Sequence, residues 1–320
     1  MEPLRDRLTQ VKSSKESRLE LINGFHLKNI RGDVLGGLTA AVVALPLALA
    51  FGNAALGPGG AIYGLYGAVV VGFLAALFGG TPAQVSGPTG PMSVTVAGVV
   101  ASLAAVGVPR DLSAGEILPL VMAAVVIGGL FQILFGLLRL GKYITLVPYS
   151  VVSGFMSGIG VIIITLQIGP LLGISTRGGV LESLEFLINN FSPNGAAIGV
   201  AVMTLGIVFL TPRKISQWVP SPLLALLIVT PLSILLFGDS SIDRIGEIPE
   251  GGLRLNLPDP SFNDFFPIIL KAGLVLAVLG AIDSLLTSLV ADNISQTRHN
   301  SDRELIGQGI GNAIAGIFTG

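Results

Sequence analysis

Long apolar runs recur along the whole chain, and their length constrains the fold more than any other feature of the sequence. A helix needs about 20 apolar residues to cross a hydrocarbon layer roughly 30 Å thick. Inside that layer the backbone must satisfy its own hydrogen bonds, so the runs predict helices and not open strands. We predict membrane spans at residues 34–52, 61–79, 91–106, 118–138, 144–172, 196–211, 222–237 and 267–291, with a further span that begins near Leu305.

Composition supports a membrane protein and argues against several other classes. Charged residues make up 12 % of the chain, against about 25 % in soluble domains, and the mean hydropathy is +0.81. The sequence contains no Cys, which excludes disulfides and thiolate metal sites. The net charge of −1 argues against a nucleic-acid partner. His26 and His299 both lie outside the predicted spans, so a histidine-based zinc site or hydrolase triad is not expected.

The basic residues predict the orientation of the chain. If residues 1–33 lie in the cytoplasm, thirteen of the 18 Lys and Arg residues fall on the cytoplasmic side. The other five, on the opposite side, are Arg110, Arg177, Arg244, Arg254 and Lys271. The positive-inside rule therefore predicts a cytoplasmic amino-terminal segment, residues 1–33, and a transmembrane domain over residues 34–320 in the plasma (inner) membrane.

Two parts of the chain resemble each other at a spacing of about 240 residues. Leu65, Gly67, Phe78 and Gly80 pair with Leu305, Gly307, Phe318 and Gly320. Upstream of these, "GGLTAAVVALPLALAFG" resembles "KAGLVLAVLGAIDSLLTSLV" with a one-residue slip. With these upstream segments included, the charge count places the start of the first copy inside and the start of the second outside, so the repeat is inverted. Inverted repeats with broken helices are typical of secondary transporters, which hold substrate near the membrane midplane. We expect a first repeat that extends to about residue 237 and a second that starts at about residue 267, and the chain therefore to be part of a larger membrane domain.

The segment from Thr81 to Pro91 is expected to break a helix inside the membrane. Its run "SGPTGP" contains two prolines and two glycines that cannot continue a helix, and Pro91 suits the first turn of a new one. A helix that begins near Gly90 would aim free N–H groups and the positive end of its dipole at the midplane, where an anion satisfies them. Thr89 adds a hydroxyl. The alternative is a Pro-kinked span with Thr89 as an ordinary N-cap.

Asp283 is the charged residue that we place near the middle of a predicted span. A carboxylate at that depth costs at least about 2.5 kcal/mol, so it should face a cavity, a cation or a hydrogen-bond donor. Thr287 lies one turn further on the same helix face. A carboxylate beside an anion site requires either a proton or a cation between the two charges, and Asp283 with Thr287 offers oxygen ligands suited to sodium. The alternative is an interhelical Asp with a packing role.

Several separate segments resemble the SulP family of anion transporters. They include "YGLYGA" at residues 63–68 and the run from Gly129 to Gly173, while "GPTGPM" and "AIDSLLTS" are most similar to the sodium-dependent bicarbonate transporters of that family. The resemblance covers residues 27–320. It implies an all-α polytopic fold of two inverted repeats of seven spans each, with a core and a gate domain and with half-helices that meet at the substrate.

The resemblance also implies roles for individual residues. Thr89, with Gly90 at the helix start, would lie at the anion, and Asp283 and Thr287 at the sodium ion. Family members carry a cytoplasmic STAS domain that contributes to dimerisation. We do not find it in this sequence, and we expect a homodimer of the full-length protein.

We therefore expect a membrane transporter, not an enzyme, that couples bicarbonate uptake to sodium by alternating access, with no cofactor besides the coupling ion. One alternative is a proton-coupled transporter of sulfate or a dicarboxylate, with Asp283 as the proton carrier. Another is an anion channel on the same fold. An intramembrane enzyme is disfavoured because Asp283 has no second buried carboxylate, His or Cys in the predicted spans with which to form a catalytic pair.

Overall fold

The computed structural model describes residues 30–57, 59–105, 117–146, 148–174, 176, 180–216, 219, 221–238, 242 and 262–318. Within these ranges the chain is almost wholly helical and contains no strand. The elements are α2 (Ile30–Leu56), α3 (Ala61–Phe78), α4 (Gly90–Ala105), α5 (Ile117–Leu137), the 3-10 helix η4 (Leu140–Leu146), α6 (Tyr149–Leu172), α7 (Val180–Asn189), α8 (Gly195–Leu210), α9 (Arg213–Ser216), α10 (Ser221–Phe237), α11 (Phe262–Ser295) and α12 (Ser301–Phe318).

Each predicted span corresponds to a helix. Four helices are long and apolar enough to cross a membrane on their own, namely those at Gly32–Leu56, Ala61–Phe78, Ile117–Leu137 and Phe265–Ser295. Four shorter apolar helices, including Gly90–Ala104 and Gly195–Leu210, account for most of the other predicted spans. The predicted cytoplasmic segment falls almost entirely on residues 1–29, which lie outside the described residues.

Three predicted boundaries were wrong. The span expected over 144–172 is divided, because η4 ends at Leu146 and α6 begins at Tyr149 directly after Pro148, which suits the start of a helix. The span expected over 267–291 is longer at both ends, since α11 extends from Phe262 to Ser295. The connection before α8 contains a helix, α7, that no long apolar run predicts, because Glu182 and Glu185 interrupt its apolar residues.

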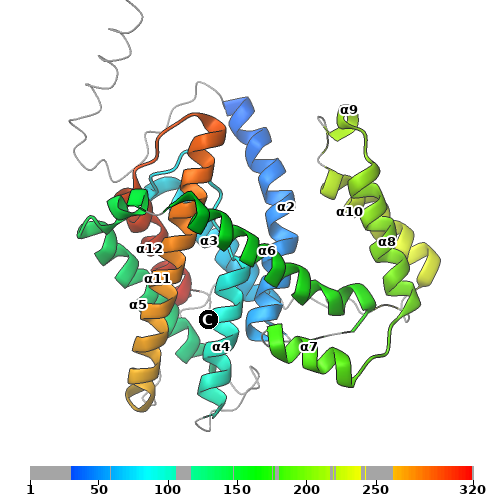
Figure 1. Cartoon of the computed structure of the whole chain (residues 1–320), viewed down its shortest axis with the longest axis horizontal. Coiled ribbons are helices and arrows are strands. Elements are labelled where there is room, and N and C mark those ends of the chain that lie inside the picture. Colours follow the sequence, from blue (N-terminus) through cyan, green and yellow to red (C-terminus); the bar gives the residue numbers. More distant parts are fainter. Residues whose placement is uncertain are drawn as a thin grey trace, which may run out of the picture.

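The helices fall into two groups (Figure 1). In the first group α12 packs against α5 and α3, α11 packs against α5, and α2 packs against α3 and α4. In the second group α8 contacts α10 and α6, and α6 also contacts α7. The main described links between the groups are contacts of α4 with α6 and of α2 with α10. The first group holds the larger apolar core, where Leu103, Ile117 and Ile269 are fully buried.

The two copies of the repeat pack directly against each other. Helices α3 and α12 begin at residues 61 and 301, the same spacing as the sequence repeat. They run antiparallel, because Gly307 near the start of α12 lies against Gly79 after the end of α3, while Gly311 lies further back against Val71. The fold is therefore an inverted-repeat helical membrane fold, and the glycine run at 307–311 serves close helix packing as small residues do in membranes.

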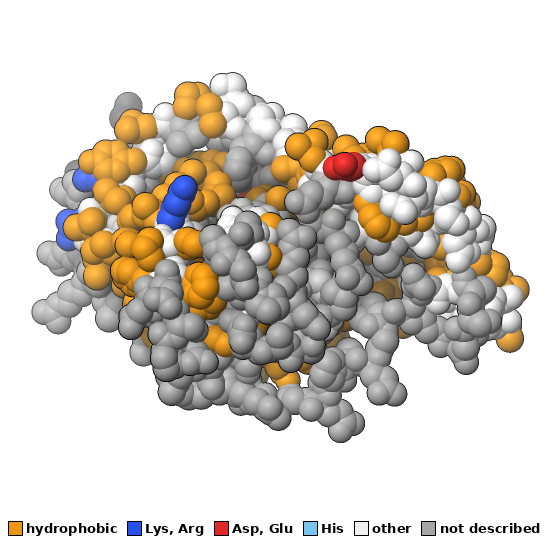
Figure 2. Space-filling model, turned by 90° about the horizontal axis from the view of Figure 1, so that it is seen from below, with side chains coloured by type: hydrophobic (Ala, Val, Ile, Leu, Met, Phe, Trp, Pro, Cys, Tyr) orange, Lys and Arg blue, Asp and Glu red, His pale blue; other side chains and the backbone are white. Residues whose placement is uncertain are grey.

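Large apolar side chains cover much of the described outer surface. Phe209, Leu210 and Leu235 are each at least 80 % exposed, and Figure 2 shows hydrophobic side chains spread over the face seen there. Contiguous exposed apolar surface is unusual for a soluble monomer. It fits a surface that contacts lipid.

Candidate functional site

The chain breaks between two helices at the segment predicted to do so. Helix α3 ends at Phe78, residues 79–89 are not helical, and α4 begins at Gly90. The prediction of a helix start at Gly90 is thereby confirmed, and a continuous kinked span over this segment is excluded. Pro88 and Pro91 explain the break, because neither has an N–H to donate and Pro91 occupies the first turn of α4.

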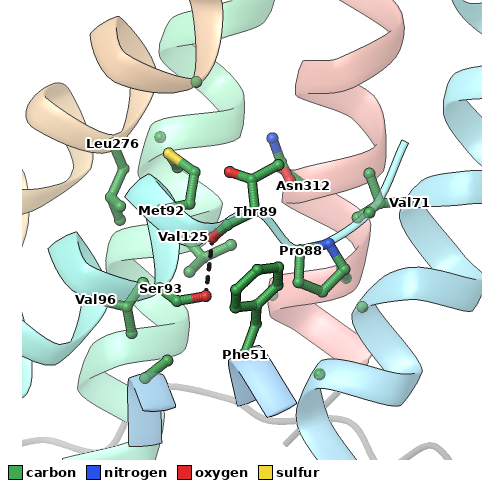
Figure 3. A pocket seen from close by; sticks show the side chains of 18 of the residues that line it. Phe51, Val71, Pro88, Thr89, Met92, Ser93, Val96, Val125, Leu276 and Asn312 are labelled. Atoms are coloured by element: carbon green, nitrogen blue, oxygen red, sulfur yellow. Dashed lines mark hydrogen bonds between the residues drawn. The ribbon is translucent and has the colours of Figure 1, made fainter. Parts of the chain in front are cut away.

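A cavity of about 200 Å³ opens beside this break. One water needs roughly 10–15 Å³ of such space, so a small polyatomic anion fits together with several waters. Most of the cavity lining is apolar (Figure 3). The polar side chains in the lining are those of Tyr63, Thr89, Ser93, Gln132, Asp283, Ser284, Gln308 and Asn312.

The lining comes from six helices, α2, α3, α4, α5, α11 and α12, and from the break itself. All six belong to the first group of helices. Figure 3 shows Thr89 among side chains from these elements, with Met92 and Leu276 to one side of it and Asn312 to the other. The fold therefore brings residues from both ends of the described chain together at one cavity.

Thr89 is the residue immediately before α4, and it lines the cavity. Its backbone carbonyl accepts hydrogen bonds from Ser93 N and Ser93 Oγ, both at 2.9 Å. Its side-chain Oγ1, in contrast, is buried and has no partner at hydrogen-bonding geometry. Thr89 thus does not act as an ordinary N-cap, and it leaves the first N–H groups of α4 without the cap that such a side chain normally supplies.

Asp283 on α11 lines the same cavity. Its carboxyl lies close enough to the Thr89 side chain for the two to interact, although the contact falls short of the geometry of a formed hydrogen bond. The structure therefore brings together the two residues that the sequence analysis assigned to the anion and to the cation. One lies in the break before α4 and the other in α11, almost 200 positions apart in the sequence.

Thr287 and Gly90 are near the cavity but are not among the residues that line it. Thr287 Oγ1 donates to the backbone carbonyl of Asp283 at 2.8 Å. Because the hydroxyl proton points at its own helix, the lone pairs of the oxygen point away from that helix and can accept. Gly90 is buried, and a Cβ there would lie 3.0 Å from Ile163 of α6. Gly90 therefore serves the close approach of α4 to α6, at one of the contacts between the two helix groups.

In the described lining of the cavity, Asp283 is the only charged residue. None of the described residues in its lining is Lys, Arg or His. The described part of the chain also contains no group of three or more His, Cys, Asp or Glu side chains that could hold a metal ion. The described lining thus offers hydroxyl, amide and backbone groups and one carboxylate, and it contains no positively charged side chain.

Three amides at the cavity were not predicted from the sequence. Asn312 Nδ2 donates to Gln132 Oε1 at 2.7 Å, and Gln308 lies one turn before Asn312 on α12. Gln132 is 1 % exposed and Gln308 is 5 % exposed. Buried amides inside apolar helices are the signal that would have found Gln132, since a polar group at that depth requires a partner.

An inverted-repeat helical fold, with a broken helix at a cavity that holds several buried polar groups, is typical of secondary transporters. The chain belongs to the sulfate permease family, whose model matches residues 30–320. It is 47 % identical to the bicarbonate transporter BicA of Picosynechococcus over 308 residues, which are 94 % of this chain and 53 % of that protein. The chain thus spans about half the length of this curated relative.

Solved structures agree with the assignment. The transmembrane domain of a cyanobacterial bicarbonate transporter BicA matches with a TM-score of 0.81 and 48 % identity, over 94 % of this chain and 76 % of that one. The murine anion transporter of solute carrier family 26, member A9, in its inward-facing state, matches with a TM-score of 0.71 at 17 % identity, over 98 % of this chain and 57 % of that one. The second match shows the shared fold. The relatives are transporters by name, which points to transport and away from catalysis.

Proposed function

We propose that the protein takes up bicarbonate together with sodium by alternating access, with the anion at Thr89 and the start of α4 and the cation at Asp283 and Thr287. The similarity to bicarbonate transporters supports the substrate. The observation that carries the site is the unpartnered, buried Thr89 hydroxyl beside the Asp283 carboxyl. A buried hydroxyl without a partner is costly, so a bound ligand that pairs with it is favoured.

The charges around the cavity support coupling to a cation. An anion next to an ionised Asp283 would be repelled, and no basic side chain of the described lining offsets that charge. A sodium ion between the carboxylate and the anion removes the conflict, because it attracts both. Each ion then improves the site for the other, and the coupling is reciprocal.

The same charges favour a monovalent anion. A dianion such as sulfate would bring two negative charges to a cavity whose described lining holds one carboxylate and no cationic side chain. The charges of bicarbonate and one sodium ion cancel, so the net charge in the cavity is then that of Asp283 alone among the described lining residues. Its oxygens can accept from the Thr89 hydroxyl and from the first N–H groups of α4, and the helix dipole supports this.

The runner-up is a proton-coupled transporter of sulfate or a dicarboxylate. The family description favours it, and a protonated Asp283 would also relieve the repulsion of an anion. An anion channel on the same scaffold is a third reading. All three differ in what drives uptake.

Uptake of radiolabelled bicarbonate by the full-length protein tests these readings. We expect uptake that requires sodium and that excess sulfate does not inhibit. Uptake driven by a proton gradient without sodium would support the runner-up. Uptake that follows only the bicarbonate gradient, without either ion, would indicate a channel and contradict the proposal.

A further inference from the structure

Glu304 is a buried carboxylate, and it lies apart from the cavity that Asp283 lines. It is located in the first turn of α12 and is 2 % exposed. It is not among the residues that line the cavity. Burying a carboxylate costs free energy unless hydrogen bonds satisfy its oxygens. Its hydrogen-bond partners therefore indicate its role.

Both carboxylate oxygens of Glu304 accept hydrogen bonds that lead to the break between α3 and α4. Oε2 accepts from the backbone N–H of Gly80 at 2.8 Å, 224 residues away along the chain. Oε1 accepts from Gln308 Nε2 at 2.8 Å. The same Gln308 nitrogen donates to Ser86 Oγ at 2.5 Å. Helix α12 thus holds the segment 79–89 at Gly80 and again at Ser86.

The backbones at this contact are too close for a side chain between them. A Cβ on Gly80 would lie 2.1 Å from the carbonyl oxygen of Asn300, just before α12. Asn300 N also donates to the Gly80 carbonyl at 3.0 Å. The beginning of the segment therefore lies directly on the start of α12, and glycine is required at position 80 by space.

Helix α11 holds the same segment from another side. Ser288 is fully buried, and its Oγ lies 2.8 Å from both Gln84 Oε1 and Thr81 Oγ1. Residues 80 to 86 are thereby fixed to α11 and α12. Only Gly87, Pro88 and Thr89 remain between this anchored part and the start of α4, and all three line the cavity.

We propose that Glu304 is a positioning residue, whose hydrogen bonds anchor segment 79–89 on α12 and so hold the Thr89 hydroxyl and the start of α4 at the cavity. It contacts neither the anion nor the cation. Of these two carboxylates, Asp283 serves the ions and Glu304 holds the break in position. The transport readout below rests on the proposed function, whereas the exchange readout does not.

Two substitutions of similar length separate hydrogen bonding from charge. In Glu304→Gln the side-chain oxygen can still accept from Gly80 N–H. Its new NH₂ group can pair with the Gln308 oxygen if that amide turns over, and Ser86 can then donate to the same oxygen. In Glu304→Met no acceptor remains, and the Gly80 N–H is left unpaired.

Sodium-dependent bicarbonate uptake by the full-length protein is the first measurement. We expect Glu304→Gln to keep the KM for bicarbonate within about threefold of the wild type, and Glu304→Met to raise it roughly tenfold or more, as the loss of a hydrogen bond to a charged group does. Glu185→Gln, on the exposed face of α7, is the control. If Glu304→Gln abolishes uptake as fully as Glu304→Met, Glu304 acts through its charge and the proposal is wrong.

Hydrogen–deuterium exchange of the purified full-length protein is the second measurement and requires no transport. We expect amides of segment 79–89 to exchange roughly tenfold faster in Glu304→Met and in Gly80→Ala. The matched control is Gly98→Ala on α4, where a Cβ meets nothing within 4 Å. Unchanged exchange in both variants refutes the anchor. Faster exchange in a protein that shows no bicarbonate uptake would preserve the anchor and reject the proposed function instead.

Discussion

Replacing Asp283 with Asn removes the only charge in the described lining of the cavity while it keeps the size of the side chain. For a sodium ion about 4 Å from the carboxylate, at an effective dielectric constant of about 20, the lost attraction is about 4 kcal/mol. Each 1.4 kcal/mol is a factor of ten, so sodium affinity should fall roughly a thousandfold. Sodium at ordinary concentrations would then no longer fill the site.

The expected result is bicarbonate uptake close to background at every practical sodium concentration. Asp283→Asn protein should still insert into the membrane, because a neutral amide costs less to bury than a carboxylate. Radiolabelled uptake over a range of sodium concentrations, normalised to the amount of protein in the membrane, measures this. Asp33→Asn, at the exposed start of α2, is the control. Uptake by Asp283→Asn that still depends on sodium as in the wild type would refute the assignment of the cation site.

Three further predictions concern the anion, the cation and the topology. Thr89→Ala should raise the KM for bicarbonate roughly tenfold while Thr89→Ser stays close to the wild type, because only the hydroxyl pairs with the anion; concentration-dependent uptake measures this, and equal effects of the two changes would contradict it. Thr287→Ala should raise the sodium concentration for half-maximal uptake with a smaller effect on the maximal rate, and a sodium titration that matches the wild type would remove Thr287 from the site. A Cys placed at Ser14 should resist a membrane-impermeant thiol reagent applied to intact cells, and labelling from outside would overturn the predicted orientation.

The break at residues 79–89 was predictable because its cause is local. Pro88 and Pro91 lack the N–H that a helix needs, and this property belongs to the residue in any fold. The spans were predictable for a similar reason, since the hydrophobicity of a long apolar run is also a property of its own residues and favours an apolar environment in any fold. Asp283 was found because a carboxylate in the middle of such a run demands a partner. Helix α7 was missed because an amphipathic helix of ten residues has no such run.

Only the tertiary structure shows which partner each polar side chain has. Glu304 stands in a polar helix start that looks exposed in the sequence, yet it is buried against Gly80, 224 residues away. The contact of Gln132 with Asn312 bridges 180 residues, and the Thr89 hydroxyl is buried without a hydrogen-bond partner at a cavity that six helices line. Sequence determines what each side chain can donate, accept or exclude. Which groups meet is decided by the packing of distant helices. A hydrogen bond acts over only about 3 Å, and the residues between its two partners in the sequence do not reveal that the partners meet.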